Sequence, residues 1–141
     1  MNNPIFAPVI ALVGWSLVML IWLVVARTGA IKKADPAALA KPGLRGSDLD
    51  GILPDKAQWP AHNYNHLMEQ PTLFYAVAII LALAGGGAGT DMYLAWAYTG
   101  LRIVHSLIQC TSNNVGIRFP VWALASLVLL AMTVRASLLV Y

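Results

Sequence analysis

The feature that most constrains this chain is a polar triplet inside an apolar stretch. Residues 92–110 are mostly apolar and long enough to cross a bilayer as a helix, yet they contain Arg102, His105 and Gln109. These three residues are spaced i, i+3 and i+7, so they share one face of a helix. An arginine deep in a membrane span costs about 2.5–3.5 kcal/mol on insertion scales, so it normally faces a partner, a polar cavity or a ligand. The rest of the chain is expected to pack around this face.

The composition indicates a membrane protein. Of the 141 residues, 59% are hydrophobic and 11% are charged, whereas a soluble domain carries about 25% charged residues. The net charge of +3 is small and the basic residues form no stripe, which argues against a nucleic-acid partner. The single cysteine, Cys110, excludes an intrachain disulfide framework and a zinc site built on cysteines. We expect one compact membrane domain over residues 1–141.

Four apolar segments predict an all-α, polytopic bundle of four transmembrane helices. The helices are expected at about residues 5–26, 59–84, 90–110 and 118–139, with a polar loop at about 27–58. The first segment lacks the basic n-region of a cleaved signal peptide, so we expect it to be retained as a helix. Trp59 and Pro60 are expected to begin the second helix, and Pro71 to kink it. The loop is typical of a solvated connector, with a short helical piece near residues 35–40.

The distribution of basic residues predicts the orientation. Six of the nine Lys and Arg residues lie in the loop between the first and second helices, and Arg118 lies beside the loop between the third and fourth. The N-terminus and the glycine-rich turn at residues 85–89 carry none. The positive-inside rule therefore predicts that both basic loops are cytoplasmic and that both termini lie on the non-cytoplasmic side.

A second polar cluster lies on the second helix, where His62, His66 and Glu69 are spaced i, i+4 and i+7. A rise of 1.5 Å per residue puts Glu69 and Arg102 at similar depths, about 10–13 Å from the same membrane surface. One interpretation is a buried ion pair that holds the bundle together. A surplus of polar groups in the same half favours instead a cavity for a charged, polar ligand. The surplus consists of His62, His66, His105, Gln109 and Arg118.

A metal site is an alternative for the same helix face. His62, His66 and Glu69 would present three ligands to one ion. However, the His-x-x-x-His spacing arises often by chance, and the chain has only three histidines. We therefore predict no metal.

These polar motifs carry a family resemblance. The residues that carry it are Asn65-His66-Leu67-Met68-Glu69-Gln70-Pro71-Thr72-Leu73-Phe74-Tyr75, then Arg102-Ile103-Val104-His105-Ser106, then Arg118. Together they resemble the superfamily of membrane-associated proteins in eicosanoid and glutathione metabolism (MAPEG), most closely its bacterial members. The resemblance covers almost the whole chain and implies a four-helix bundle that assembles as a homotrimer in the bacterial inner membrane. It also implies glutathione as co-substrate, bound between subunits near the cytoplasmic side, and a lipophilic electrophile or peroxide as second substrate.

The resemblance also assigns roles to individual residues. Glu69 and Arg102 match the carboxylate and the arginine of the glutathione site, and His105 matches a histidine found there in several members. Arg118 matches an arginine that is held, in some members, to stabilise the glutathione thiolate. These four residues are therefore candidates for binding glutathione, with Arg118 as the catalytic candidate.

Other positions depart from the family pattern. His62 stands where glutathione-using members often have arginine, and His66 stands where they have asparagine. Asn63 or Asn65 would supply this asparagine in a shifted register, and Gln109 replaces a frequent tyrosine. We retain His62, Asn65, His66 and Gln109 as candidate ligand-binding residues, with a weaker clamp for the glutathione carboxylates as the expected consequence.

The expected function is a glutathione-dependent membrane transferase or peroxidase acting on lipophilic electrophiles that enter from the membrane lipid. Arg102 and His62 would bind carboxylates, and Glu69 would bind the amine. Arg118 would favour the thiolate and so lower the pKa of the thiol. The alternative is a non-catalytic membrane protein of the same fold that binds a lipid or a partner in the cavity.

Overall fold

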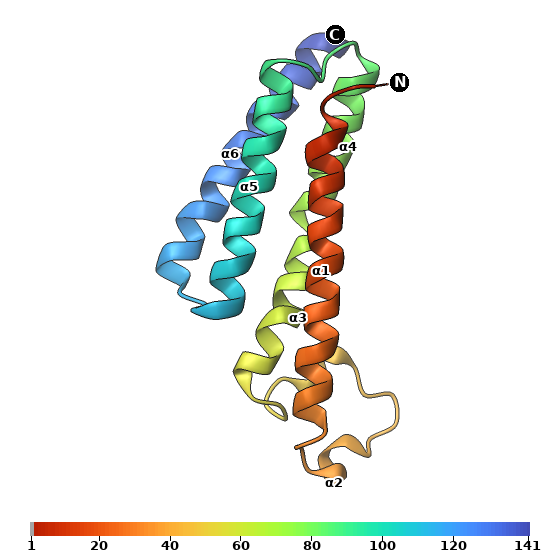
Figure 1. Cartoon of the computed structure of the whole chain (residues 1–141), viewed down its shortest axis with the longest axis vertical. Coiled ribbons are helices and arrows are strands. Elements are labelled where there is room, and N and C mark those ends of the chain that lie inside the picture. The colour runs from red at the N-terminus through yellow and green to blue at the C-terminus, as the bar shows by residue number, and fades with distance from the viewer. Residues whose placement is uncertain (1) are drawn as a thin grey trace.

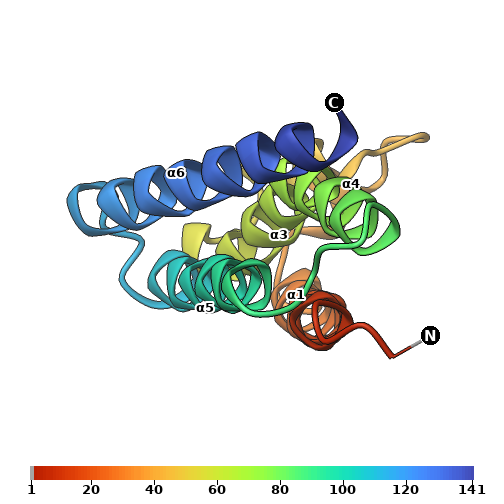
Figure 2. The ribbon, with the colours of Figure 1, turned by 90° about the horizontal axis from the view of Figure 1, so that it is seen from above.

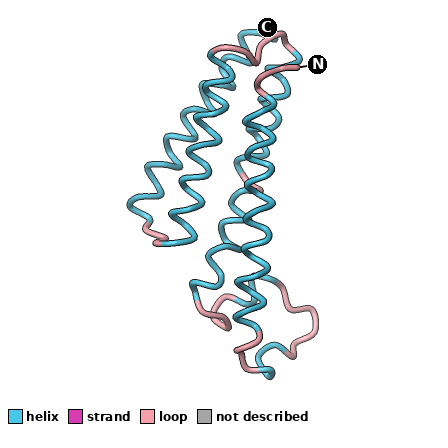
Figure 3. The backbone as a smooth tube through the Cα atoms, viewed as in Figure 1, coloured by secondary structure: helices cyan, strands magenta, loops and turns pink. Residues whose placement is uncertain are grey.

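The structure, a computed structural model, describes residues 2–141, which are helical and contain no strand (Figures 1 and 3). The all-α class is therefore confirmed. The elements are α1 (Phe6–Ile31), α2 (Pro36–Leu39), the short 3₁₀ helix η1 (Gly46–Leu49), α3 (Asp55–Leu67), α4 (Gln70–Leu83), α5 (Thr90–Thr111) and α6 (Val115–Val140).

The long helices form two groups that meet along α5. α1 packs against α3, α5 and α6 form a hairpin, and α5 also contacts α1 and α3 while α4 contacts α6. Figure 1 shows the α5–α6 hairpin leaning away from α1 and α3 at its lower end, and Figure 2 shows the same helices from above. Both chain termini and the turn at residues 84–89 lie at one end, called here the terminal end. The end with the loop at residues 32–54 and the turn at 112–114 is called the loop end.

In the described part of the chain, three helical units are long and apolar enough to cross a membrane: α1, the α3–α4 unit (Asp55–Leu83) and α6. α5 is not among them, and its 22 residues include the buried Asp91, Arg102, His105 and Gln109. Large apolar side chains are exposed on α1 and α6, as expected for surfaces that face lipid tails. Among them are Ile10, Leu17 and Ile21 of α1 and Leu127, Leu130 and Leu138 of α6.

The second apolar segment is two helices rather than the single helix expected at residues 59–84. It begins at Asp55, so Pro60 lies inside α3, and it is interrupted at Met68 and Glu69 between α3 and α4. Pro71 lies in the first turn of α4, where its missing N–H removes no helical hydrogen bond. The irregularity expected at Pro71 is therefore a two-residue interruption just before it, within one membrane-length unit, Asp55–Leu83.

The second half of the long loop is folded onto the helices. Leu49 is 7% exposed and Leu53 is 3% exposed, so both are part of the interior. Arg27 donates from Nε to Gln58 Oε1 at 3.0 Å and from Nη2 to the carbonyl of Gly46 at 2.9 Å. The loop is therefore not a solvated connector throughout, since Leu49 and Leu53 anchor it to the helices, although most of residues 46–54 are exposed.

The remaining helix ends also differ from those expected. α1 runs to Ile31 rather than to about residue 26, and α6 begins at Val115 rather than at about residue 118. α6 begins earlier because the Asn114 side chain accepts the N–H of Gly116 at 2.9 Å, which caps the helix. A short helix expected near residues 35–40 is present as α2, with Asp35 accepting the N–H of Ala37 at 2.9 Å.

The terminal end is closed by paired polar groups. Asp91, only 2% exposed, forms an ion pair with Arg135 of α6 and accepts the N–H of Gly87 at 2.9 Å. Gly87 has a φ of 94°, which side chains rarely adopt, so glycine allows this tight approach. Asn3 donates to the carbonyl of Gly86 at 2.9 Å and ties the N-terminal segment to the same turn.

Candidate functional site

A cleft of about 560 Å³ lies in the loop-end half, between α3–α4 and the α5–α6 hairpin. This volume falls in the range of roughly 300–1,000 Å³ typical of small-molecule sites. Its lining residues are His62, His66, Glu69, Gln70, His105, Gln109, Val115, Arg118, Phe119 and Trp122. Six of the eight residues proposed from the sequence are thus brought together, while Asn65 and Arg102 are not in the lining.

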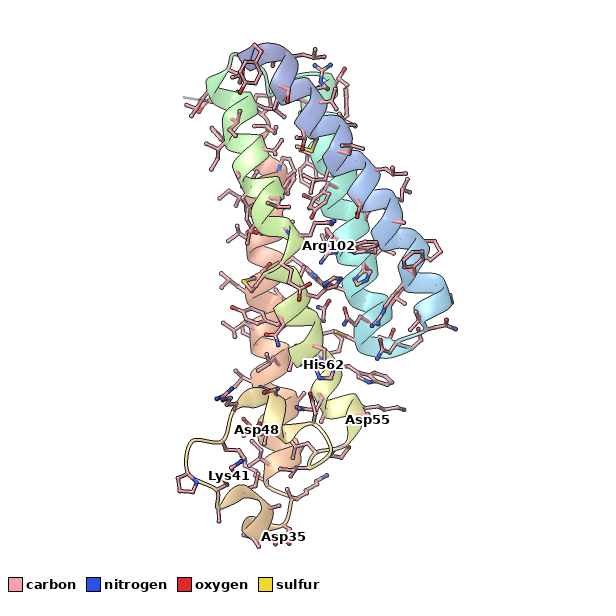
Figure 4. The ribbon with its side chains drawn as sticks, turned by 180° about the vertical axis from the view of Figure 1, so that it is seen from behind. Asp35, Lys41, Asp48, Asp55, His62 and Arg102 are labelled. Atoms are coloured by element: carbon pink, nitrogen blue, oxygen red, sulfur yellow. The ribbon has the colours of Figure 1, made fainter. Side chains whose placement is uncertain are left out.

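Arg102 lies in the interior beside the cleft rather than on its wall (Figure 4). Its side chain is fully buried, and Nη2 donates to the backbone carbonyl of His66 at 3.1 Å. Within residues 2–141, Nε and Nη1 have no hydrogen-bond partner. Asn65, by contrast, is exposed on α3 and lies outside the cleft.

Glu69 does not pair with Arg102, so the alternative interpretation of these two residues as a buried ion pair is wrong. The Glu69 side chain is 68% exposed, and its Oε2 lies 2.8 Å from His66 Nδ1. The periodicity that placed Glu69 on the inner face assumed an unbroken helix. Because α3 ends at Leu67, the Glu69 side chain does not lie on the face that an unbroken helix would give it, and it lines the cleft instead.

Three histidines reach the cleft, each in a different setting. His66 is held by Glu69, and its ring lies 5.0 Å from that of His105, tilted by 55°. His105 is only 2% exposed, and its Nδ1 has no partner in the described part of the chain. His62, further toward the loop end (Figure 4), lies 2.9 Å from Asp50 Oδ1 through Nε2.

Asp50 joins the loop to this histidine. It accepts a second hydrogen bond from Gln58 Nε2 at 2.7 Å, and Gln58 in turn accepts from Arg27. The hydrogen bonds from His62 and then from Gln58 hold the pKa of Asp50 below its ordinary value of 3.8. Asp50 therefore connects the loop to His62, one of the residues that line the cleft.

Arg118 lies in the first turn of α6 and lines the cleft. It donates to Asn113 Oδ1 in the turn between α5 and α6. Asn113 has a φ of 49°, a left-handed conformation that asparagine tolerates better than most residues. The turn therefore both reverses the chain and holds one nitrogen of Arg118.

The sequence interpretation missed the apolar wall and one polar hub of the cleft. Val115, Phe119 and Trp122 are spaced i, i+4 and i+7 on α6, a helical pattern that was present in the sequence. Gln70 accepts from the Tyr98 hydroxyl at 3.2 Å and donates to Ser126 at 2.8 Å, so it joins α4, α5 and α6. No sequence pattern signals that hub, because its partners are 28 and 56 residues away.

Within residues 2–141, buried side-chain polar atoms without a hydrogen-bond partner lie on α1, α3 and α5. Two of these side chains, His105 and Gln109, line the cleft. Because buried polar groups are normally paired, these two can hydrogen-bond a molecule held there. The other side chains are Trp15, Asn63, Arg102 and Ser106.

A metal site is not supported by the arrangement of these groups. Among residues 2–141, no three His, Cys, Asp or Glu side chains are placed to hold an ion. His62 and His66 hydrogen-bond to different carboxylates, Asp50 and Glu69, rather than converging on one point.

The fold and the cleft define an all-helical protein with membrane-spanning helices and a polar site in one half. Residues 5–138 match the profile of the MAPEG family. The chain therefore belongs to this family, which makes it a membrane protein of the glutathione- and eicosanoid-metabolism class in general. Neither the comparison with curated proteins nor that with solved structures gave a match.

Proposed function

We propose that this protein is a glutathione-dependent transferase or peroxidase that acts on lipophilic electrophiles. The observation that carries this proposal is the mixed cleft, which places charged and imidazole groups opposite an aromatic wall. A zwitterionic tripeptide needs the first kind of surface, and a lipophilic partner needs the second. The proposal includes a four-span homotrimer in the bacterial inner membrane, with both termini on the non-cytoplasmic side.

The polar wall offers a partner for each charged group of glutathione. His62 and the field of Arg102 favour its carboxylates, and the exposed Glu69 carboxylate favours its amine. Since Arg102 lies behind His66, we assign it a positioning role rather than direct contact. The unpartnered atoms of His105 and Gln109 provide further hydrogen-bonding capacity.

Arg118 is the residue proposed to favour the thiolate. A thiol with a pKa of about 8.5–9 requires roughly 2–3 kcal/mol to ionise near pH 7. One guanidinium in a site shielded from water can supply this amount. The thiolate would then attack an electrophilic carbon or a peroxide oxygen held against Phe119 and Trp122.

Calorimetric titration of the purified protein with reduced glutathione tests the binding step, and conjugation to an activated aryl chloride or reduction of a lipid hydroperoxide tests the chemistry. We expect glutathione to bind and at least one reaction to exceed the rate without protein. Binding without turnover would favour the non-catalytic alternative, and the absence of binding would overturn the proposal. Metal analysis of the same sample tests the metal alternative.

Assembly and orientation are tested separately. Native mass spectrometry in detergent is expected to give trimers, and only monomers or dimers would contradict the assembly. In a Cys110→Ser background, a cysteine at Lys41 is expected to resist a reagent that does not cross the membrane. Its labelling from outside would reverse the orientation.

A further inference from the structure

Two carboxylate–histidine pairs border the cleft, and they differ in position. His62 pairs with Asp50, which does not line the cleft. His66 pairs with Glu69, and both side chains of this pair line it. The His66 side chain is 25% exposed, so its ring is accessible yet mostly enclosed.

The hydrogen bond determines which nitrogen of His66 is available. An ionised carboxylate can only accept, so Nδ1 carries the hydrogen and donates to Glu69 Oε2. A neutral ring with its hydrogen on Nδ1 leaves a lone pair on Nε2. Within residues 2–141, Nε2 has no hydrogen-bond partner. A base oriented by a carboxylate in this way is the arrangement used to activate nucleophiles in many enzymes.

We propose that His66, oriented by Glu69, is the catalytic base that removes the proton from the thiol bound in this cleft. The inference rests on the function proposed above and adds a proton acceptor to it. In this step the S–H bond breaks, its electron pair stays on sulfur as the thiolate, and the proton moves to Nε2. No oxidant or reductant is needed. When the thiolate displaces a leaving group, the imidazolium returns its proton to that group or to water.

Three charged residues surround the His66 ring. Glu69 is in direct hydrogen-bond contact at 2.8 Å and fixes the orientation of the ring. Arg102 reaches only the backbone carbonyl of His66, and Arg118 lines the cleft from α6. The ring is therefore held by a carboxylate at Nδ1, while Nε2 can accept the proton of a thiol bound in the cleft.

The test is stopped-flow measurement of thiolate absorbance after mixing the full chain with saturating reduced glutathione. We expect His66→Ala to form thiolate about 100-fold more slowly, as is usual for the loss of a general base. Added imidazole should restore the rate of this variant in proportion to its concentration, because it can occupy the vacated space. His66→Gln, which fills that space, should be equally slow and resist rescue. Leu73→Ala is the control, since Leu73 lies on the same α3–α4 unit, is 60% exposed and does not line the cleft.

The possible outcomes separate the base from the site as a whole. Slow thiolate formation that imidazole restores supports the base. A wild-type rate in His66→Ala, or a loss that imidazole does not restore while His66→Gln retains full activity, overturns it. Absence of any thiolate signal in the wild type, with no glutathione binding by calorimetry, overturns the proposed function and the base with it. Normal wild-type turnover combined with an unaffected His66→Ala would remove the base alone.

Discussion

The buried charged residues at the two ends of the helical bundle differ in how completely they are paired. At the terminal end, Asp91 is almost fully buried and is satisfied by Arg135 and by the N–H of Gly87. At the loop end, Arg102 is fully buried, and within residues 2–141 its side chain makes a single hydrogen bond, to a backbone carbonyl. Both residues lie on α5, so the difference is not one of helix or composition.

This difference gives a physical reason to expect structural roles for polar residues at the terminal end and functional roles for those at the loop end. A buried charge with all its partners present stabilises the fold and has little left to offer a ligand. Buried donors and acceptors that lack partners carry a free-energy cost, which binding of water or a ligand removes. We therefore expect substitutions at the terminal end to change stability and substitutions at the loop end to change activity.

The largest expected effect on stability is at the terminal end. Arg135→Ala leaves the Asp91 carboxylate without its counter-ion and so lowers the free energy of unfolding, by less than for a fully buried pair because the Arg135 side chain is 43% exposed to solvent. Thermal unfolding in detergent should show this loss, while turnover per folded molecule stays at the wild-type value. The double variant Asp91→Asn, Arg135→Ala is the control and should recover part of the stability, because no charge is then left buried. Loss of turnover in folded Arg135→Ala protein would contradict the separation of the two ends.

The next effect belongs to the loop end and to Arg118. Arg118→Ala should lower turnover about 30–150-fold at neutral pH, which corresponds to a loss of roughly 2–3 kcal/mol of thiolate stabilisation. The affinity for glutathione should change much less, because the interaction acts on the ionised sulfur. The deficit should shrink as the pH approaches the pKa of the free thiol, where thiolate forms without help.

Stopped-flow thiolate absorbance across pH measures this effect directly. Arg118→Lys is the matched variant, because it keeps the charge but not the planar fork that holds Asn113. It should retain a larger share of turnover than Arg118→Ala. If the pKa of the bound thiol is the same in Arg118→Ala as in the wild type, Arg118 is only an interfacial anchor.

Periodicity predicted the buried face of α5 correctly. Arg102, His105 and Gln109 are 0%, 2% and 6% exposed, as their i, i+3, i+7 spacing implies. This prediction succeeded because α5 is continuous from residue 90 to residue 111. The same rule failed for Glu69, since the chain breaks between α3 and α4 and the helical phase is lost there.

Contacts between residues far apart in the chain could not be predicted from the sequence. An acidic residue at the start of a helix, such as Asp91, is usually explained by its favourable interaction with the helix dipole. Nothing in the sequence identifies Arg135, 44 residues later, as the partner of Asp91. Leu49 and Leu53 are two isolated apolar residues in a loop that contains glycine and proline, so they form no periodic pattern. Both are nevertheless buried. The sequence therefore predicted which helix faces are polar, but not which polar groups are satisfied.

The smallest expected effect tests the part of the loop that reaches the cleft. In Asp50→Asn the anionic acceptor shared by His62 and Gln58 is lost. The side chains of Asp50 and His62 are 49% and 43% exposed, so solvent screening limits the change in unfolding free energy to less than about 1 kcal/mol.

The direction in which this small effect changes with pH follows from the pKa shift of Asp50. The pKa of Asp50 is lower in the folded protein than its ordinary 3.8, so its contribution to stability is fully present above that value. It is lost as the pH falls through the folded pKa, where the carboxylate becomes protonated. Thermal unfolding of the wild type and Asp50→Asn should therefore differ at neutral pH and converge in strong acid. A difference that persists in strong acid would show that Asp50 acts through packing rather than through its charge. The loop would then contact a residue of the cleft without the charge of Asp50 contributing to that contact.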